Sequence, residues 1–340
     1  MTRVVHVADH TGRVLVTRDD TDHAVRRLTA AHGHRCPTRF AEAATALYRE
    51  FGRRVRTELV SALPHPAGVR VDDWDAGALR RAVVASAGPG PLVSLDPLLD
   101  AVGSALRVSR GFRPRGVHQV GLVPRPGAPS LSAQLVRLGA GGARAGCTLV
   151  EDDVYTGGTL AAVARLLAGA GIAVAGAACG IRVRVEGAPD TPVPLRSTVE
   201  YRVPLGRPDL VQVADPRSFL FGVDGLVVRV GADGWGRAPY WDPFVSAAAR
   251  LGVAAERERR FATAMIAANT AFYRGLAETT GVVVALADLP NAAPVGALDP
   301  TPDPGTPVVD YLAAVVDDLD RATERVAALD RGGVSQAVAG

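Results

Sequence analysis

Apolar residues recur at helical spacing in the first part of the chain. Between residues 40 and 59 an apolar side chain returns every three or four positions, with Pro37 before the run and Pro64 after it. This period places the apolar side chains on one face, so we predict a long amphipathic helix. The members of that face are Phe40, Ala44, Leu47, Phe51, Val55 and Leu59. A further helix is predicted from Asp96 to Val108.

From about Arg115 to Arg184 the pattern alternates between apolar runs and helical stretches. The apolar runs cover 117–123, 147–150 and 172–183, and the helical stretches cover 130–138 and 159–170. Strands that alternate with helices at this spacing are typical of a parallel sheet with helices as crossovers. The sequence therefore predicts an α/β fold with a doubly wound parallel sheet.

The last third of the chain is a mixture of strand-like and helical patterns. β-like runs lie between Thr198 and Val230, and residues 244–276 have a mainly helical pattern. From Val308 to Leu329 apolar residues repeat in steps of four and three over three heptads, which predicts one long helix with a buried seam. The seam can be covered by a helix of the same chain or by the same helix of a second subunit, so a homodimer is possible.

These patterns divide the chain into three consecutive regions. We expect a mainly helical N-terminal region over 1–85, an α/β core over 86–235, and a mainly helical C-terminal region over 236–340.

The composition excludes several classes of function. The chain has 340 residues, 38 basic and 35 acidic side chains, and no lysine, so every basic side chain is an arginine. Schiff-base chemistry and a Walker P-loop both need lysine and are excluded. The formal charge of +3 is near balance, which argues against a nucleic-acid partner. With three cysteines and no long apolar segment, we expect a cytoplasmic protein with no membrane partner.

The segment with the most chemical information is TLVEDDVYTGGTL, from Thr148 to Leu160. A predicted buried strand ends in three carboxylates, Glu151, Asp152 and Asp153, and a Thr/Gly loop then opens a helix. Main-chain N–H groups at a helix N-terminus bind anions, and glycines allow a close approach. Carboxylates at the end of a strand suit sugar hydroxyls or the water shell of a metal. An anion site next to carboxylates indicates a phosphorylated sugar.

This segment resembles the phosphoribosyl-pyrophosphate (PRPP) motif of type I phosphoribosyltransferases. The match is close over about ten residues, VEDDVYTGGT, and loose over residues 115–184. The resemblance implies a type I phosphoribosyltransferase-like fold, with the N-terminal helical and C-terminal α+β regions as additions. It implies that Glu151 and Asp152 contact the ribose hydroxyls, with Asp153 beside them. The residues that it places around the 5′-phosphate are Tyr155, Thr156, Gly157, Gly158 and Thr159.

A second loop lies where the resemblance places the pyrophosphate-binding loop. Residues 117–135 have the order strand, Pro/Gly loop, helix. Arg125 would pair with phosphate oxygens, and Gly127 would allow close approach of the main chain. In the family a mobile catalytic loop separates the two sites, whereas here only 23 residues lie between Gly127 and Glu151. This chain therefore lacks room for the usual loop at that place.

Aromatic residues gather in one Gly/Pro-rich segment, GWGRAPYWDPF. Trp235 and Tyr240 are candidates for stacking on a planar acceptor, and Arg237 is a candidate partner for an acidic group. The alternative is a loop whose rings pin it to the core.

Two functions follow from these observations. The first is a magnesium-dependent enzyme that transfers ribose 5-phosphate from PRPP to a small-molecule acceptor and releases pyrophosphate. The resemblance places Mg²⁺ on PRPP itself, with no direct protein ligand. The long additions outside the core indicate an unusual acceptor, such as a specialised metabolite. The second function is a PRPP- or nucleotide-binding regulator on the same core, without turnover, and the missing loop favours it.

Overall fold

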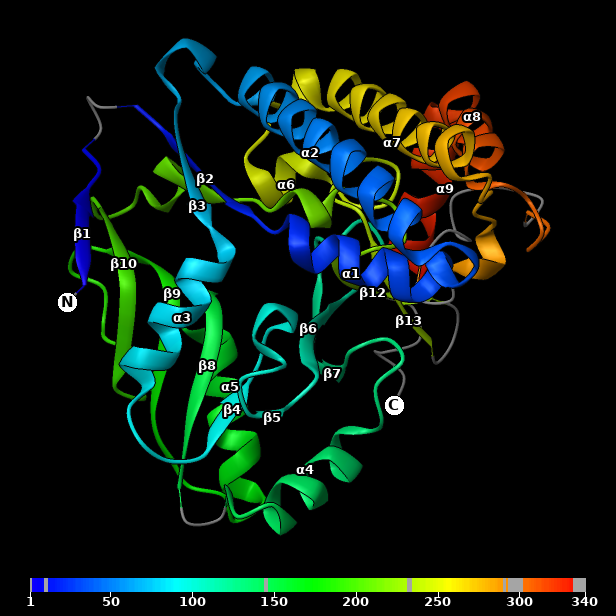
Figure 1. Ribbon diagram of the computed structural model, residues 1–340. Helices are drawn as coiled ribbons and strands as arrows, with labels where there is room; N and C mark the ends of the chain where they lie inside the picture. Colours follow the sequence, from blue (N-terminus) through cyan, green and yellow to red (C-terminus); the bar gives the residue numbers. More distant parts are fainter. Residues whose placement is uncertain are drawn as a thin grey trace. The chain divides into compact units, whose positions relative to one another are not determined.

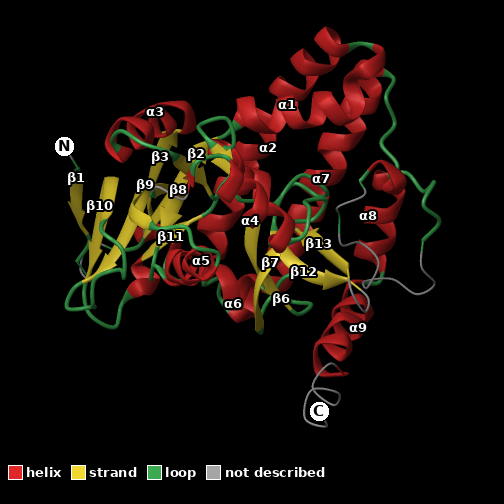
Figure 2. Ribbon diagram, turned by 90° about the horizontal axis from the view of Figure 1, so that it is seen from below, coloured by secondary structure: helices red, strands yellow, loops and turns green. Residues whose placement is uncertain are grey.

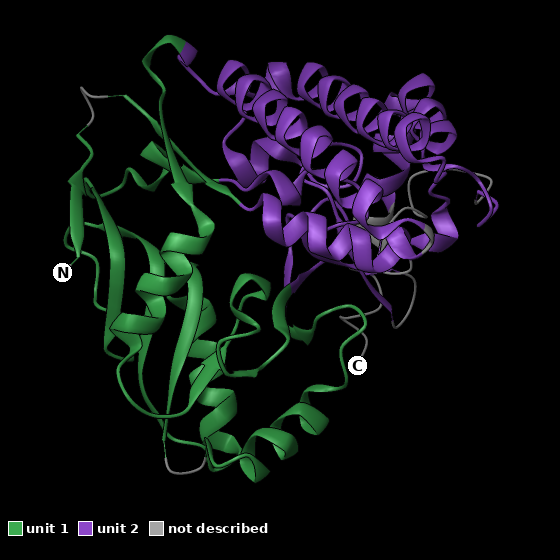
Figure 3. Ribbon diagram, in the orientation of Figure 1, with its two compact units in different colours: residues 1–19, 67–110, 122–213 green, residues 20–66, 111–121, 214–340 purple. Residues whose placement is uncertain are grey.

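The chain folds into two compact units, and each is built from three separate segments. The computed structural model describes residues 2–8, 12–143, 146–230, 234–289, 292 and 302–332. Unit 1 contains Met1–Asp19, Ala67–Arg110 and Leu122–Val213, and unit 2 contains Asp20–Pro66, Gly111–Gly121 and Ala214–Gly340 (Figure 3). The units therefore differ from the three consecutive regions that the patterns indicated. Strands β6 (Val108–Phe112) and β7 (Gln119–Pro124) each carry residues of both units.

Unit 1 is centred on a parallel sheet (Figure 1). Its strands in chain order are β1 (Arg3–His6), β4 (Leu92–Ser94), β5 (Ser104–Ala105), β8 (Cys147–Val154), β9 (Val174–Val185) and β10 (Leu195–Val203). Within the described residues the order across the sheet is β1-β10-β9-β8-β4-β5, and every neighbouring pair is parallel. The predicted α/β class with a parallel sheet flanked by helices is confirmed, and it is consistent with a type I phosphoribosyltransferase-like fold.

Helices cover both faces of this sheet (Figure 2). Their bounds are α3 (Ala76–Ala87), α4 (Leu131–Ala140) and α5 (Gly158–Gly169). On one face α3 packs through Val83 and Ala87 against Val150 and Ala178. On the other face lie apolar residues of α4 and α5, packed against Leu149 and its neighbours. Adjacent residues of β8 thus face opposite helices, as the alternation of a strand requires.

A smaller parallel sheet completes unit 1, and we call it the small sheet. It contains β2 (Val14–Asp19), β3 (Arg70–Asp75) and β11 (Val211–Val213), in the order β11-β2-β3. Strand β2 is central: Val14 to Val16 pair with β11, and Val14 to Asp19 pair with β3. Five of its six side chains are buried.

The prediction of a helix from Asp96 to Val108 is wrong. These residues form a short 3₁₀ turn at Pro97–Leu99, then β5 and the start of β6. The Asp96 carboxylate accepts a hydrogen bond of 2.7 Å from the main chain of Leu98, which stabilises the turn. A side chain at Gly103 would collide with the main-chain carbonyl of Leu92, so the chain needs glycine to return beside β4.

Unit 2 is mainly helical. Its helices are α1 (Thr21–His32), α2 (Pro37–Ala62), α6 (Ala247–Leu251), α7 (Glu258–Thr280), α8 (Val308–Asp317) and α9 (Leu319–Gly332). The long helix predicted over residues 40–59 is confirmed as α2, which packs along α7 with Phe51 edge-on to Phe272. Strands β12 (Leu226–Val230) and β13 (Gly234–Ala238) form an antiparallel pair, and β12 also pairs with Gly111 and Phe112 of β6.

The predicted terminal helix is two helices, with a break at Asp318. The seam residues from Val308 to Val326 are buried within the single chain, and the side chain of Leu329 lies outside the described part. The seam therefore does not require a second subunit to cover it. Among the described residues, no helix has the length and apolarity needed to cross a membrane.

Candidate functional site

The predicted phosphate loop connects β8 to α5 in unit 1. Gly157 is the N-cap residue of α5 and has φ of 70°, a left-handed conformation that favours glycine. A Cβ atom at this position would also meet the Thr191 side chain. Gly158 and Thr156 are exposed, and the Thr156 hydroxyl accepts a hydrogen bond of 3.4 Å from the Gly158 N–H. Thr159 lies in the first turn of α5. The loop therefore presents helix N–H groups at the surface, as an anion site requires.

The sheet topology gives a reason for a ligand to bind at this end of β8. After β8 the chain continues to β9 on one side, and after β4 it continues to β5 on the other side. The two connections leave neighbouring strands in opposite directions, and open α/β sheets bind ligands at such a switch point. Asp96 follows β4 at this place, because Ser94 pairs with Val150 and the main chain of Leu95 bonds Val150.

Three carboxylates meet at the switch point, and we call them the acid cluster. They are Asp96, Glu151 and Asp152, and each offers an oxygen within 4.8 Å of the others. Burial, followed by the negative charges of Asp152 and Asp96, raises the pKa of Glu151 well above its usual value. The neighbouring carboxylates of the acid cluster thus disfavour ionisation of Glu151.

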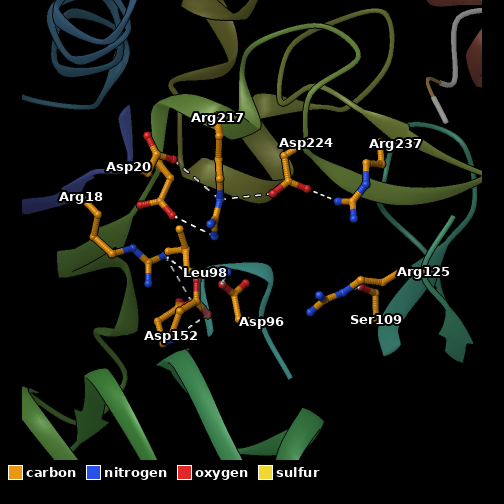
Figure 4. Close-up of polar contacts among 12 residues, drawn as sticks. Arg18, Asp20, Asp96, Leu98, Ser109, Arg125, Asp152, Arg217, Asp224 and Arg237 are labelled. Atoms are coloured by element: carbon orange, nitrogen blue, oxygen red, sulfur yellow. Dashed lines mark hydrogen bonds and ion pairs between the residues drawn. The ribbon is translucent and has the colours of Figure 1, made fainter. Parts of the chain in front are cut away.

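A cation from the small sheet contacts the motif. The Nη2 atom of Arg18, in β2, lies 2.9 Å from an Asp152 oxygen and 3.7 Å from an Asp153 oxygen (Figure 4). The Arg18 side chain is 5% exposed, so this ion pair is shielded from water. Asp153 and Asp152 are therefore held by the same guanidinium group.

Tyr155 is also bound to the small sheet. Its hydroxyl donates to the Val211 carbonyl at 3.2 Å and accepts from the Val213 N–H at 2.7 Å, both in β11. Burial, followed by the charge of Asp153, raises the pKa of Tyr155 above its usual value, so the hydroxyl keeps its proton. The Tyr155 side chain thus fixes the start of the phosphate loop to β11.

The predicted pyrophosphate residues lie after β7 in unit 1. Arg125 is 8% exposed, and its Nε donates to the Val108 carbonyl at 3.2 Å and the Ser109 hydroxyl at 3.3 Å. A terminal nitrogen of Arg125 also donates to the Leu95 carbonyl. Arg125 therefore holds the turn that carries Asp96. Gly127 has φ of 77°.

The predicted acceptor residues belong to unit 2. Trp235 and Arg237 lie in β13, and Tyr240 follows it with its ring 6.1 Å from that of Phe219. The Arg237 guanidinium is buried and forms an ion pair with Asp224. These contacts favour a loop pinned by its own rings and charges.

Arg237 is part of a buried set of charges in unit 2, which we call the ion network (Figure 4). Its members are Asp20, Asp215, Arg217, Asp224 and Arg237. Arg217 lies 3.2 Å from Asp215, 3.2 Å from Asp224 and 3.8 Å from Asp20. Tyr48 adds a hydrogen bond of 2.6 Å to Asp20.

Sequence reasoning missed two residues of the unit 1 site, Arg18 and Asp96. Arg18 is separated from the motif by more than a hundred positions, and no local pattern links the two. Asp96 did carry a signal, because it follows the apolar run Leu92–Leu95 and precedes a proline. Interpreted as the end of a strand, that run would have placed Asp96 at the edge of the sheet.

Compared with models of known protein families and with curated proteins, the chain matches none.

Proposed function

We propose that this protein is a phosphoribosyltransferase that transfers ribose 5-phosphate from PRPP to a small-molecule acceptor and releases pyrophosphate. The observation that carries the proposal is the position of the motif. Its carboxylates and its exposed helix N-terminus lie together at the switch point of a parallel sheet. One end of this site suits a phosphate, and the other suits hydroxyls.

The roles of the residues follow from their chemistry. The N–H groups at the start of α5, with Thr156 and Thr159, bind the 5′-phosphate. Asp152 accepts hydrogen bonds from the ribose hydroxyls and stabilises positive charge that develops on the sugar as pyrophosphate leaves. Glu151, whose pKa is raised by burial and by the neighbouring carboxylates, contacts the ribose hydroxyls beside Asp152.

Two loops are candidates for binding pyrophosphate. The first is the loop with Arg125 and Gly127, as the resemblance implies. The second is the turn after β4, residues 95–100, which lies next to β8. In the second case residues 101–146 separate the pyrophosphate loop from the motif, and they include β6, β7 and α4. The chain then has length for a covering segment that the shorter interval after Gly127 lacks.

The donor set of the acid cluster fits a hard divalent cation. Magnesium prefers carboxylate and phosphate oxygens, and the oxygens of Asp96, Glu151 and Asp152 lie close together. Bound Mg²⁺ would be held mainly by PRPP, with these carboxylates beside it, and it would neutralise charge on the leaving pyrophosphate. Without a cation, the acid cluster would repel the anionic substrate.

One observation favours the alternative, a regulator that binds PRPP or a nucleotide without turnover. Arg18 pairs with Asp152 and Asp153, and its positive charge offsets part of the negative charge that would stabilise a developing cation on the sugar. The buried ion pair of Arg237 with Asp224 also makes Arg237 a poor candidate for contact with an acceptor.

A single experiment separates the two functions. The protein is incubated with PRPP, Mg²⁺ and a panel of bases, amines and phenols, and released pyrophosphate is measured. Binding by calorimetry together with acceptor-dependent pyrophosphate supports the enzyme. Binding with no pyrophosphate for any acceptor supports the regulator, and the absence of PRPP binding rejects both.

A further inference from the structure

Two segments of the predicted motif are attached to the small sheet, and both attachments lie within unit 1. Arg18 of β2 pairs with Asp152 and Asp153, and the Tyr155 hydroxyl bridges two main-chain groups of β11. The acids and the start of the phosphate loop are therefore held from one structure. The small sheet is separate from the six-stranded sheet that contains β8, and its residues are not part of the local sequence pattern of the motif.

The position of Arg18 is firmly set. Strand β2 is hydrogen-bonded on both sides, to β11 and to β3, and Arg18 pairs in register with Trp74. With its main chain fixed and its side chain 5% exposed, the guanidinium group has little freedom to leave the carboxylates. An arginine suits this place because its planar group carries several donors and keeps its charge at any pH of interest.

The contact geometry distinguishes among the three acids of the motif. Arg18 reaches Asp152 at 2.9 Å and Asp153 at 3.7 Å, whereas Glu151 belongs to the acid cluster with Asp96. Asp152 is the one residue that belongs to both sets. Asp152 therefore links the Arg18 contact to the acid cluster.

We propose that the small sheet is the positioning frame of the PRPP site, in which Arg18 fixes the orientation of Asp152 for the ribose hydroxyls and β11 fixes the phosphate loop through Tyr155. The inference rests on the proposed function. Arg18 and Tyr155 are positioning residues, because they act through Asp152 and through the loop. Loss of either contact should weaken PRPP binding in a protein that is still folded.

The test is a double-mutant cycle on PRPP affinity, measured by calorimetry with MgCl₂ in wild type, Arg18→Gln, Asp152→Asn and the double variant. Arg18→Gln should weaken binding about 10- to 100-fold, the range for loss of a hydrogen bond to a charged group. In the Asp152→Asn background the same change should cost less than about 3-fold, because the residue through which Arg18 acts is already altered. Tyr155→Phe should weaken binding about 2- to 10-fold, as for a neutral hydrogen bond.

The matched control is Arg13→Gln. Arg13 directly precedes β2 and pairs with Asp209. The substitution therefore removes the same charge next to the same sheet without touching the motif. Its PRPP affinity should equal that of wild type. Circular dichroism and thermal unfolding check that each variant is folded. If Arg18→Gln does not fold, Arg18→Lys takes its place in the cycle.

The outcomes are separable. Wild-type protein that does not bind PRPP overturns the proposed function. Wild-type binding with unchanged affinity in folded Arg18→Gln overturns the positioning frame alone. Equal losses from Arg18→Gln with and without Asp152→Asn also overturn it, because Arg18 would then act independently of Asp152. A loss that appears only when Asp152 is intact supports the inference.

Discussion

Each unit contains a group of neighbouring charged side chains, and the two groups differ in composition. In the ion network of unit 2 every carboxylate lies within 4.0 Å of an arginine nitrogen. In the acid cluster of unit 1 three carboxylates share one site, and burial and the charges of Asp152 and Asp96 raise the pKa of Glu151. Buried charges normally have partners. The ion network is therefore explained by stability, whereas the acid cluster lies at a sheet switch point, where the proposed ligand site is.

The largest expected effect is on stability, after removal of the central cation of the ion network. Arg217→Met leaves three buried carboxylates without their common partner, which should lower the free energy of unfolding by about 3–5 kcal/mol. Chemical denaturation followed by circular dichroism measures the change. Arg259→Met is the control, because it removes an exposed pair with Asp320 and should cost less than about 1 kcal/mol. Similar losses in both variants would contradict a structural role for the network.

A substitution in the phosphate loop should weaken PRPP binding without preventing folding. A Cβ atom at Gly158 meets only the Thr156 hydroxyl, at 3.5 Å, so Gly158→Val should fold normally. Its side chain would occupy the space that the phosphate needs, and PRPP affinity should fall more than about 100-fold. Calorimetry measures the affinity, and Gly169→Ala at the other end of α5 is the control. A folded Gly158→Val protein with wild-type affinity would reject the loop as a phosphate site.

The carboxylate of Asp152 should matter more for turnover than for binding. Asp152→Asn keeps the shape and removes one negative charge, so stabilisation of the developing cation is lost. Pyrophosphate release should fall about 100-fold and PRPP affinity by a smaller factor, because the interaction is strongest in the transition state. Asp209→Asn, a surface change in the same unit, should alter neither. Equal turnover in Asp152→Asn and wild type would assign the role to Glu151 or Asp153.

The smallest effect concerns pH and a histidine of unit 2. Burial, followed by the charges of Arg217 and Arg27, lowers the pKa of His23 to about 3. In the unfolded chain His23 takes up a proton below about pH 6.5, so its contribution to stability is present above pH 6.5 and is lost as pH falls toward 3. Between pH 7.5 and pH 5.0 wild type should lose about 2 kcal/mol more than His23→Gln. Equal losses in paired denaturation curves would contradict the assignment.

Local periodicity accounts for the elements that the sequence predicted. The apolar face of α2 can be recognised within one continuous stretch of sequence, and so can the strand-loop-helix order of β8 and α5. Strands β4 and β5 are only three and two residues long, so they carry no period that could be recognised. The break between α8 and α9 leaves the apolar repeat intact, and it is stabilised by Asp318, which pairs with Arg321 and Arg325.

The candidate site was predictable only where its residues are consecutive. Glu151 to Thr159 form one motif, and their common location follows from the strand and helix that carry them. Arg18 and Asp96 reach the same place through strand pairing, which depends on the order of strands in the sheet. A single sequence does not contain that order. Arg125 and Arg237 illustrate the converse, since an arginine in a promising loop can make its contacts with neighbouring parts of the fold.

The pairing of β1 with β10 has a consequence for how the chain acquires its structure. Arg3 pairs with Val199, and Arg13 of the next segment pairs with Asp209. On the ribosome these early residues emerge long before their partners are made. Strand β1 must remain unpaired until β10 has been synthesised, and β2, which can pair early with β3, must wait for β11; such distant pairings form slowly. Folding of unit 1 should therefore be completed late, and the frame that positions the motif should be among the last parts to form.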